Sequence, residues 1–227
     1  GFPVAPWRAA WNADDVAEAA RSLGRCRLKS RHGGYDGRGQ ARLEPTDEPI
    51  ALGVAAEQAW QEMGAVPCVV ERELDLSAEF SMMAARRPSG QIALFPPARN
   101  WHVGGILDLS VIPGDLPDRA IAAASSQTRR MAEALGLEGV LAVEWFLTID
   151  GDVFVNELAP RPHNTFHTTK SACLTSQFEQ FVRAVCDLPL GSTDLVRPVA
   201  LANLLGDLWL TDRMPALDEV LAIPGVR

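Results

Sequence analysis

Hydrophobic positions recur with two different periods along the chain, so the sequence predicts a mixture of helices and strands. Apolar residues at helical spacing predict helices over residues 12–24, 51–63, 116–135, 174–186 and 217–221. Short alternating or β-branched runs predict strands over residues 26–30, 66–71, 78–85, 91–95, 105–112 and 199–205. Hairpins grouped with helices, without regular β-α-β alternation, favour an α+β fold of two lobes. The expected lobes are residues 1–95 and 96–227.

A further hairpin is predicted around Asp150-Gly151, the residue pair typical of a two-residue type I′ turn. Ile149 then faces Asp152, and counting back along both strands places Glu144 opposite Glu157. Directly opposed carboxylates repel each other unless a cation lies between them. Mg²⁺ binds one or two carboxylates together with substrate phosphates, so this pair predicts a metal-bound nucleotide. The alternative is a solvated hairpin whose two glutamates point apart into water.

The overall charge narrows the classes of partner. The chain has 227 residues and a net charge of -8, so it lacks the broad basic surface that nucleic acid or an anionic membrane requires. No apolar stretch reaches the about 18 residues of a membrane span.

Four scattered cysteines suit reduced thiols in a cytoplasmic protein. The chain starts at Gly1 and ends in I-P-G-V-R, so both ends are expected to lie inside a longer protein.

A glycine-rich loop over Arg31–Gln40 follows the strand that ends near Lys29. Such a loop turns backbone N–H groups toward phosphate oxygens while a lysine supplies a positive charge. The loop matches neither a Walker A motif nor a Rossmann fingerprint, and a glycine loop alone is weak evidence. Glu71 and Glu79 are candidates to accept hydrogen bonds from adenine or ribose, with surface charge at strand ends as the alternative.

A polar cluster follows Glu157 in the string N-E-L-A-P-R-P-H-N. Arg161, His163 and Asn164 supply donors that suit a small oxyanion beside a metal-bound phosphate, although a structural turn would also explain them. His163 and His167 have the i, i+4 spacing of zinc ligands, but Pro162 and Asn164 indicate a loop that would not align them.

Five segments together resemble the N5-carboxyaminoimidazole ribonucleotide synthetases, the ATPase subunits of phosphoribosylaminoimidazole carboxylase in the ATP-grasp family. They are L-K-S-R-H-G-G-Y-D-G-R-G-Q (residues 28–40), V-V-E-R-E-L-D-L-S-A-E (69–79), N-W-H-V-G-G-I-L (100–107), N-E-L-A-P-R-P-H-N (156–164) and T-S-Q-F-E-Q (175–180). The resemblance runs in order through nearly the whole chain. It implies an ATP-grasp fold, in which two α+β lobes clasp ATP between them.

The resemblance also assigns roles to individual residues. It implies that Glu144 and Glu157 bind Mg²⁺ and that Arg161, His163 and Asn164 position bicarbonate, with Lys29 also acting in catalysis. Tyr35, Asp36 and Arg38 would meet the imidazole nucleotide. The implied ATP-binding residues are Lys29, Gly34, Tyr35, Asp36, Gly37, Arg38, Gly39, Gln40, Glu71, Arg72, Glu73, Leu74, Glu79, His102, Asn156 and Glu157. Ideal strand alternation turns the side chain of Asn156 to the other face, so its contact is expected through the backbone or a distorted strand end.

The implied activity is that of a ligase in purine biosynthesis, which uses ATP and Mg²⁺ to carboxylate 5-aminoimidazole ribonucleotide with bicarbonate through carboxyphosphate. Family members are homodimers that also have a Rossmann-like domain before this region and a small domain after it, so the fragment alone is expected to lose activity. Phe166 replaces a glycine of the family beside the bicarbonate position, and Gly104 replaces an aspartate. The alternatives are a formate-dependent ATP-grasp ligase acting on glycinamide ribonucleotide, and a non-catalytic nucleotide-binding module.

Overall fold

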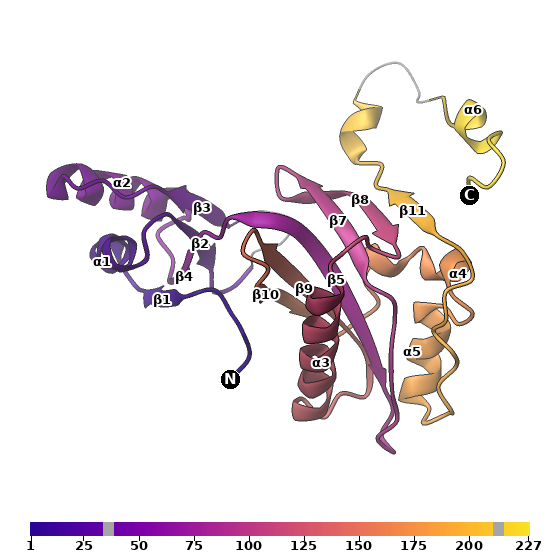
Figure 1. The fold of residues 1–227 in the computed structure, drawn as a ribbon. Helices are drawn as coiled ribbons and strands as arrows, with labels where there is room; N and C mark the ends of the chain where they lie inside the picture. The colour runs from indigo at the N-terminus through magenta and orange to yellow at the C-terminus, as the bar shows by residue number, and fades with distance from the viewer. Residues whose placement is uncertain (34–38, 211–215) are drawn as a thin grey trace.

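The computed structural model describes residues 1–33, 39–210 and 216–227. Five residues of the expected phosphate loop, Gly34, Tyr35, Asp36, Gly37 and Arg38, lie outside the described residues. The described chain forms two sheets, each with its own helices (Figure 1). Antiparallel pairing relates every neighbouring pair of strands in both sheets.

The smaller sheet has four strands in the order β1-β4-β2-β3. Its strands are β1 (Trp7–Ala10), β2 (Cys26–Ser30), β3 (Gln40–Leu43) and β4 (Cys68–Arg72). Helices α1 (Ala13–Leu23) and α2 (Pro49–Glu62) pack against this sheet and against each other around one apolar core. The Asn12 side chain caps α1 by accepting a hydrogen bond from the backbone N–H of Asp15.

The larger sheet has seven strands in the order β10-β9-β5-β7-β8-β11, with β6 paired to β5. Its strands are β5 (Leu76–Arg86), β6 (Ile92–Leu94), β7 (Ala98–Val103), β8 (Ile106–Ile112), β9 (Gly139–Thr148), β10 (Val153–Ala159) and β11 (Val199–Ala202). Helix α3 (Asp118–Ala134) packs against β5 and β9. Helix α5 (Gln177–Val185) also packs against β9, and Figure 1 shows it on the opposite side of the sheet from α3.

Strand alternation gives the larger sheet two different faces. Phe80 and Trp145 point into the apolar core beneath α3, and their rings stack with centroids 6.4 Å apart. On the other face, Met83 and Ala142 join a second core under the chain that follows β10. Glu79 and Glu144 belong to this second face but lie beyond its apolar part, so the same strands carry a packed core and a polar site.

The remaining elements follow β10 and β11. A 3-10 turn (Asn164–Phe166), the short helix α4 (Thr169–Ala172) and α5 close the second core. A second 3-10 turn (Gly206–Trp209) and α6 (Leu217–Leu221) come after β11, and α6 buries no residue. Within the described ranges, no helix is both long and apolar enough to cross a membrane.

The predicted helices and most predicted strands are present with shifts of a few residues, whereas β1, β3 and β7 were not expected. The string that precedes and enters β7, P-P-A-R-N-W-H, indicated a loop, but Asn100 pairs with Glu79 of β5 and with Ser110 of β8. The division expected at residues 95 and 96 falls inside the larger sheet, between β6 and β7. By sheets and cores the division comes before Leu76, because β5 pairs with β9 over its whole length.

Candidate active site

The β9–β10 hairpin has a different turn from the one expected. Val153 pairs with Leu147, and the N–H of Thr148 donates to the carbonyl oxygen of Asp152 at 2.9 Å. The connection therefore has three residues, 149–151, and Gly151 takes a φ of 86° that suits glycine. The predicted two-residue turn is wrong, and the register is displaced by one residue as far as the pair Val155 and Trp145.

A β-bulge at Asn156 corrects this displacement. The register shifts between Val155 and Glu157, and Glu157 then pairs directly with Glu144. The predicted opposition of the two glutamates is confirmed, although it arises from a longer turn and an extra residue together. The bulge also brings the Asn156 side chain to the polar face, where its Nδ2 donates to Oε2 of Glu144 at 3.2 Å. The expected strand distortion at Asn156 is therefore present.

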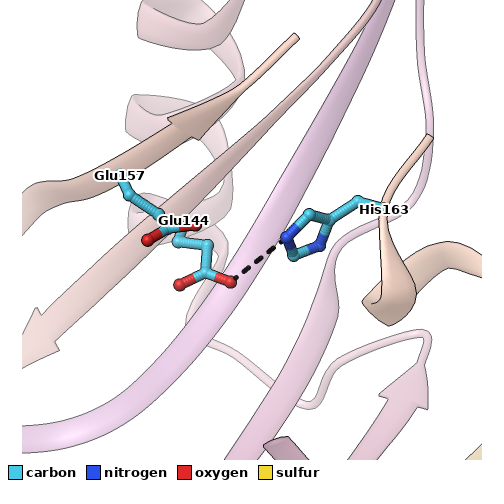
Figure 2. A group of neighbouring side chains, drawn as sticks. All are labelled: Glu144, Glu157 and His163. Carbon is cyan, nitrogen blue, oxygen red and sulfur yellow. Dashed lines mark ion pairs between the residues drawn. The ribbon is translucent and has the colours of Figure 1, made fainter. Parts of the chain in front are cut away.

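Glu144 and Glu157 lie close together, and His163 approaches them from the loop after β10 (Figure 2). Nε2 of His163 is 3.6 Å from Oε1 of Glu144, and one potential ligand atom from each of the three residues lies within 4.8 Å of the others. Burial, together with the neighbouring Glu157, raises the pKa of Glu144 to about 7. Burial and the nearby Arg161 lower the pKa of His163 to about 4, so its ring is neutral near pH 7.

These charges fit a divalent cation. Glu144 is partly buried, and its raised pKa follows from this burial and from the neighbouring carboxylate of Glu157, while the third member of the group, His163, is neutral. Oxygen donors of this kind suit Mg²⁺. The site therefore has the ligand chemistry that the sequence predicted for the metal-bound nucleotide.

Lys29 links the smaller sheet to this group. Its Nζ donates to Oδ1 of Asn156 at 3.0 Å and lies 2.7 Å from Oε2 of Glu71. The same ammonium group lies 6.0 Å from the centre of the Phe146 ring. A continuous polar chain thus runs from Glu71 through Lys29 and Asn156 to Glu144. It brings a cation suited to phosphate next to the carboxylate pair.

Glu79 and His102 form a second polar pair on the same sheet. Oε2 of Glu79 lies 2.9 Å from Nδ1 of His102, an ion-pair distance. The Glu79 carboxylate raises the pKa of His102. On β5, Glu79 pairs with Phe146 of β9. Two residues further along the same strand, Ser81 pairs with Glu144. The predicted ribose and nucleotide residues are therefore near the carboxylate pair.

The segment after β4 is held by the smaller sheet. Both carboxylate oxygens of Glu73 are engaged by arginines, with nitrogen–oxygen distances of 3.4 Å from Arg25, 3.2 Å from Arg27 and 2.7 Å from Arg42. Nε of Arg72 donates to the carbonyl oxygen of Leu23. The Arg72 and Glu73 side chains thus have partners within the protein. Contacts of this segment with adenine would fall to its backbone and to Leu74, which is partly buried.

The two described ends of the expected loop also lie near Lys29. The Gly39 carbonyl oxygen accepts a hydrogen bond from the Ser30 N–H at 2.9 Å, and Gly39 has a φ of 68°. Gln40 pairs with Lys29 across β2 and β3. The residues just before and just after the loop therefore both lie beside Lys29.

The predicted oxyanion residues lie on one loop, with different exposure. His163 is buried, Asn164 is partly buried, and Arg161 is exposed with its guanidinium donating to the carbonyl oxygen of Pro162. His167 stacks on Phe178 and is absent from the three-residue ligand group formed by described residues. The structure therefore gives no support to a zinc site at His163 and His167.

The two departures from the family pattern have structural explanations. Phe166 is fully buried and packs against Phe95 with ring centroids 6.2 Å apart, so its side chain fills the core. Gly104 has a φ of 59° in the turn between β7 and β8, a conformation that favours glycine.

Sequence reasoning assigned no role to Gln177 or Thr165. Both side chains are buried and both contact His163. The only available signal was the string T-S-Q-F-E-Q, which includes Gln177 within the resembling segments.

Comparison with known proteins identifies the family of this chain. The family model for the ATP-grasp domain matches residues 1–178. An N5-carboxyaminoimidazole ribonucleotide synthase of Bacillus subtilis (strain 168) is 40% identical over 208 residues, covering 91% of this chain and 53% of the relative. The chain spans about half the length of the curated relatives it matches.

Solved structures show the same fold. A crystal structure of an N5-carboxyaminoimidazole ribonucleotide synthetase in complex with ADP is 40% identical, with a TM-score of 0.83, and the match covers 91% of this chain and 53% of the other. The Staphylococcus aureus N5-carboxyaminoimidazole synthetase complexed with ADP is 30% identical, with a TM-score of 0.84, covering 97% and 56% respectively.

Proposed function

Because the chain belongs to the ATP-grasp domain family, we propose that it supplies the ATP- and bicarbonate-binding part of an N5-carboxyaminoimidazole ribonucleotide synthase. The reaction is the carboxylation of the 5-amino group of 5-aminoimidazole ribonucleotide, with ADP and phosphate as products. One observation carries this proposal. Lys29 of the smaller sheet donates a hydrogen bond to Asn156, and Asn156 donates one to Glu144 of the opposed glutamate pair. A lysine that binds phosphate beside a metal site has to lie in such a position.

In the first step, an oxygen of bicarbonate attacks the γ-phosphorus of ATP. A new P–O bond forms, the bond to the β-phosphate oxygen breaks, and ADP leaves. Glu144 and Glu157 would hold Mg²⁺, which supplies charge neutralisation for the phosphates. Lys29 would leave Glu71 to bind phosphate oxygens, and Asn156 would keep it aligned with the metal site.

In the second step, the 5-amino nitrogen attacks the carbon of carboxyphosphate, phosphate leaves, and the nitrogen loses a proton. Arg161, His163 and Asn164 would position bicarbonate for the first step. The neutral ring of His163 would then act as a hydrogen-bond partner and not as a positive charge. The loop residues Tyr35, Asp36 and Arg38 would cover the intermediate, since carboxyphosphate hydrolyses in water.

Three wider assignments rest on the resemblance and on the cysteines. We propose a homodimer in the cytoplasm, with 5-aminoimidazole ribonucleotide and bicarbonate as substrates. All four cysteines are free thiols, and burial raises the pKa of Cys26, Cys68 and Cys173 to about 11. Cysteines that form no disulfide suit a reducing compartment.

The proposal is tested by phosphate release from MgATP in the complete protein. Release that requires both bicarbonate and 5-aminoimidazole ribonucleotide, and that is lost in Glu157→Gln, is the expected result. Release with formate and glycinamide ribonucleotide would instead indicate the other ligase. Binding of MgATP without release under either condition would indicate a non-catalytic nucleotide-binding module.

A further inference from the structure

We infer that Gln177 is a positioning residue that clamps the backbone of His163 and so holds the oxyanion loop beside the metal site. Gln177 is the first residue of α5, is fully buried and lies 14 positions beyond His163 in the sequence. This inference rests on the proposed function, because it deepens the role given to the loop of Arg161, His163 and Asn164.

The contact between Gln177 and His163 is a double hydrogen bond. The N–H of His163 donates to Oε1 of Gln177 at 2.8 Å, and Nε2 of Gln177 donates to the carbonyl oxygen of His163 at 2.9 Å. A side-chain amide thus pairs with both backbone groups of one residue, as a neighbouring strand would. Pro162, next to His163, has no N–H to donate, and in the part of the chain that the structure describes His163 belongs to no strand pair.

The polar groups of Gln177 are all used in this arrangement. Its backbone N–H donates to Oγ1 of Thr169, whose hydroxyl donates to the carbonyl oxygen of Phe166 at 2.6 Å. The amide nitrogen also lies 2.9 Å from Nδ1 of His167. Gln177 therefore joins both ends of the turn that follows the site, and the loss of its amide would leave buried partners unpaired.

The His163 ring is held from a second direction. Its Nδ1 lies 2.9 Å from Oγ1 of Thr165, while Nε2 faces Glu144 at 3.6 Å. Oγ of Ser110 on β8 donates to the carbonyl oxygen of Thr165 at 3.3 Å. The backbone of His163 is therefore held by α5 and its ring by Thr165, beside the carboxylate pair.

The same helix provides a matched control. Gln180 is also fully buried, and its amide makes the same double hydrogen bond with the backbone of Gly191, at 2.9 Å from the Gly191 N–H and 2.8 Å to its carbonyl oxygen. Gly191 lies after α5, and both side-chain hydrogen bonds of Gln180 among the described residues go to Gly191 and not to His163. Changing Gln180 therefore removes equal chemistry from the same helix without touching His163.

The test compares Gln177→Met with Gln180→Met in the complete protein, first by amide hydrogen exchange. Gln177→Met should raise the exchange rate of the His163 amide at least about 10-fold, whereas Gln180→Met should leave that amide unchanged. Gln177→Glu keeps an acceptor for the N–H but loses the donor, so it should retain much of the protection. If Gln177→Met fails to fold, Gln177→Glu replaces it in the comparison with Gln180→Met. Unchanged exchange at His163 in Gln177→Met, or equal loss in both Met variants, would overturn the clamp.

Kinetics provide the second readout. Gln177→Met should raise the KM for bicarbonate about 10-fold or more while the KM for ATP changes less than about twofold, and Gln180→Met should change neither. Equal rises in both KM values would overturn a positioning role specific to the oxyanion. If the unmodified protein shows no bicarbonate-dependent turnover, the proposed function fails, but the exchange experiment still decides whether Gln177 clamps the loop.

Discussion

Two acidic clusters in this protein differ in how their charge is balanced. Glu73 lies in the smaller-sheet unit among Arg25, Arg27 and Arg42, so its carboxylate is compensated within the chain. Glu144 lies in the larger sheet beside Glu157, Asn156 and a neutral His163, and its pKa rises to about 7. The first cluster has the composition of a structural junction. The second has the composition of a site completed by a cation from outside the chain.

The largest expected effect comes from removing Glu157, one of the two proposed metal ligands. Glu157→Gln keeps the shape of the side chain but removes half of the carboxylate pair, and ATP turnover should fall about 1,000-fold. Phosphate release at saturating MgATP measures this change. Turnover within about twofold of the unmodified protein would mean that Glu157 is not part of the metal site.

The pH dependence of stability distinguishes Glu144 from its neighbours. The pKa of Glu144 is raised from 4.5 to about 7, so the folded chain binds more protons than the unfolded chain between these values. Its contribution to the free energy of unfolding therefore falls as the pH rises through this range. The lowered pKa of His163, about 4 against 6.5, has the opposite sign and increases stability as the pH rises.

Glu144→Gln removes the first contribution and keeps the second. Without divalent cations, the variant should gain up to about 3 kcal/mol in unfolding free energy relative to the unmodified chain between about pH 5 and about pH 7.5. Urea unfolding at several pH values in the presence of a chelator measures this difference. A difference that stays constant with pH would contradict the raised pKa of Glu144.

A smaller effect is expected where the two sheets meet. Asn156→Ala removes the link between Lys29 and Glu144, so the KM for ATP should rise about 10-fold while the fold is retained. Steady-state kinetics and circular dichroism test this together. An unchanged KM would show that Lys29 finds the phosphates without its partner on the bulge.

The smallest effect is expected in the compensated cluster. Glu73→Gln should lower the unfolding free energy by about 1 kcal/mol, because three partly exposed arginines lose a shared partner. Cation binding at the larger sheet should change less than about twofold. Loss of cation binding in this variant would show that the two clusters are not independent.

The sequence was sufficient to predict the longer helices from local periodicity and the ATP-grasp fold from specific motifs. The facing glutamates were also predicted correctly, but from a turn that the structure contradicts. The hairpin shows the limit. The expected turn was one residue too short, and the bulge at Asn156 compensated for this error. A strand register counted from the turn does not predict such a bulge, because the Asn156 side chain is held by Lys29 of the other sheet.

Other features were missed for similar reasons. The arginines around Glu73 come from distant parts of the chain, and the burial of Phe166 depends on its packing against Phe95. Strands β1 and β3 have only four residues each, too few for a clear alternation. These features of the structure therefore depend on contacts between residues far apart in the sequence, which local patterns of residues do not predict.

The binding of Mn²⁺ in the presence of a non-hydrolysable ATP analogue tests the central claim most directly, with electron paramagnetic resonance to measure free and bound ion. The double variant Glu144→Gln, Glu157→Gln should bind Mn²⁺ at least about 100-fold more weakly than the unmodified protein, while Glu73→Gln should bind as the unmodified protein does. Equal affinity in the double variant and the unmodified protein would contradict the assignment of the opposed glutamates as the cation site.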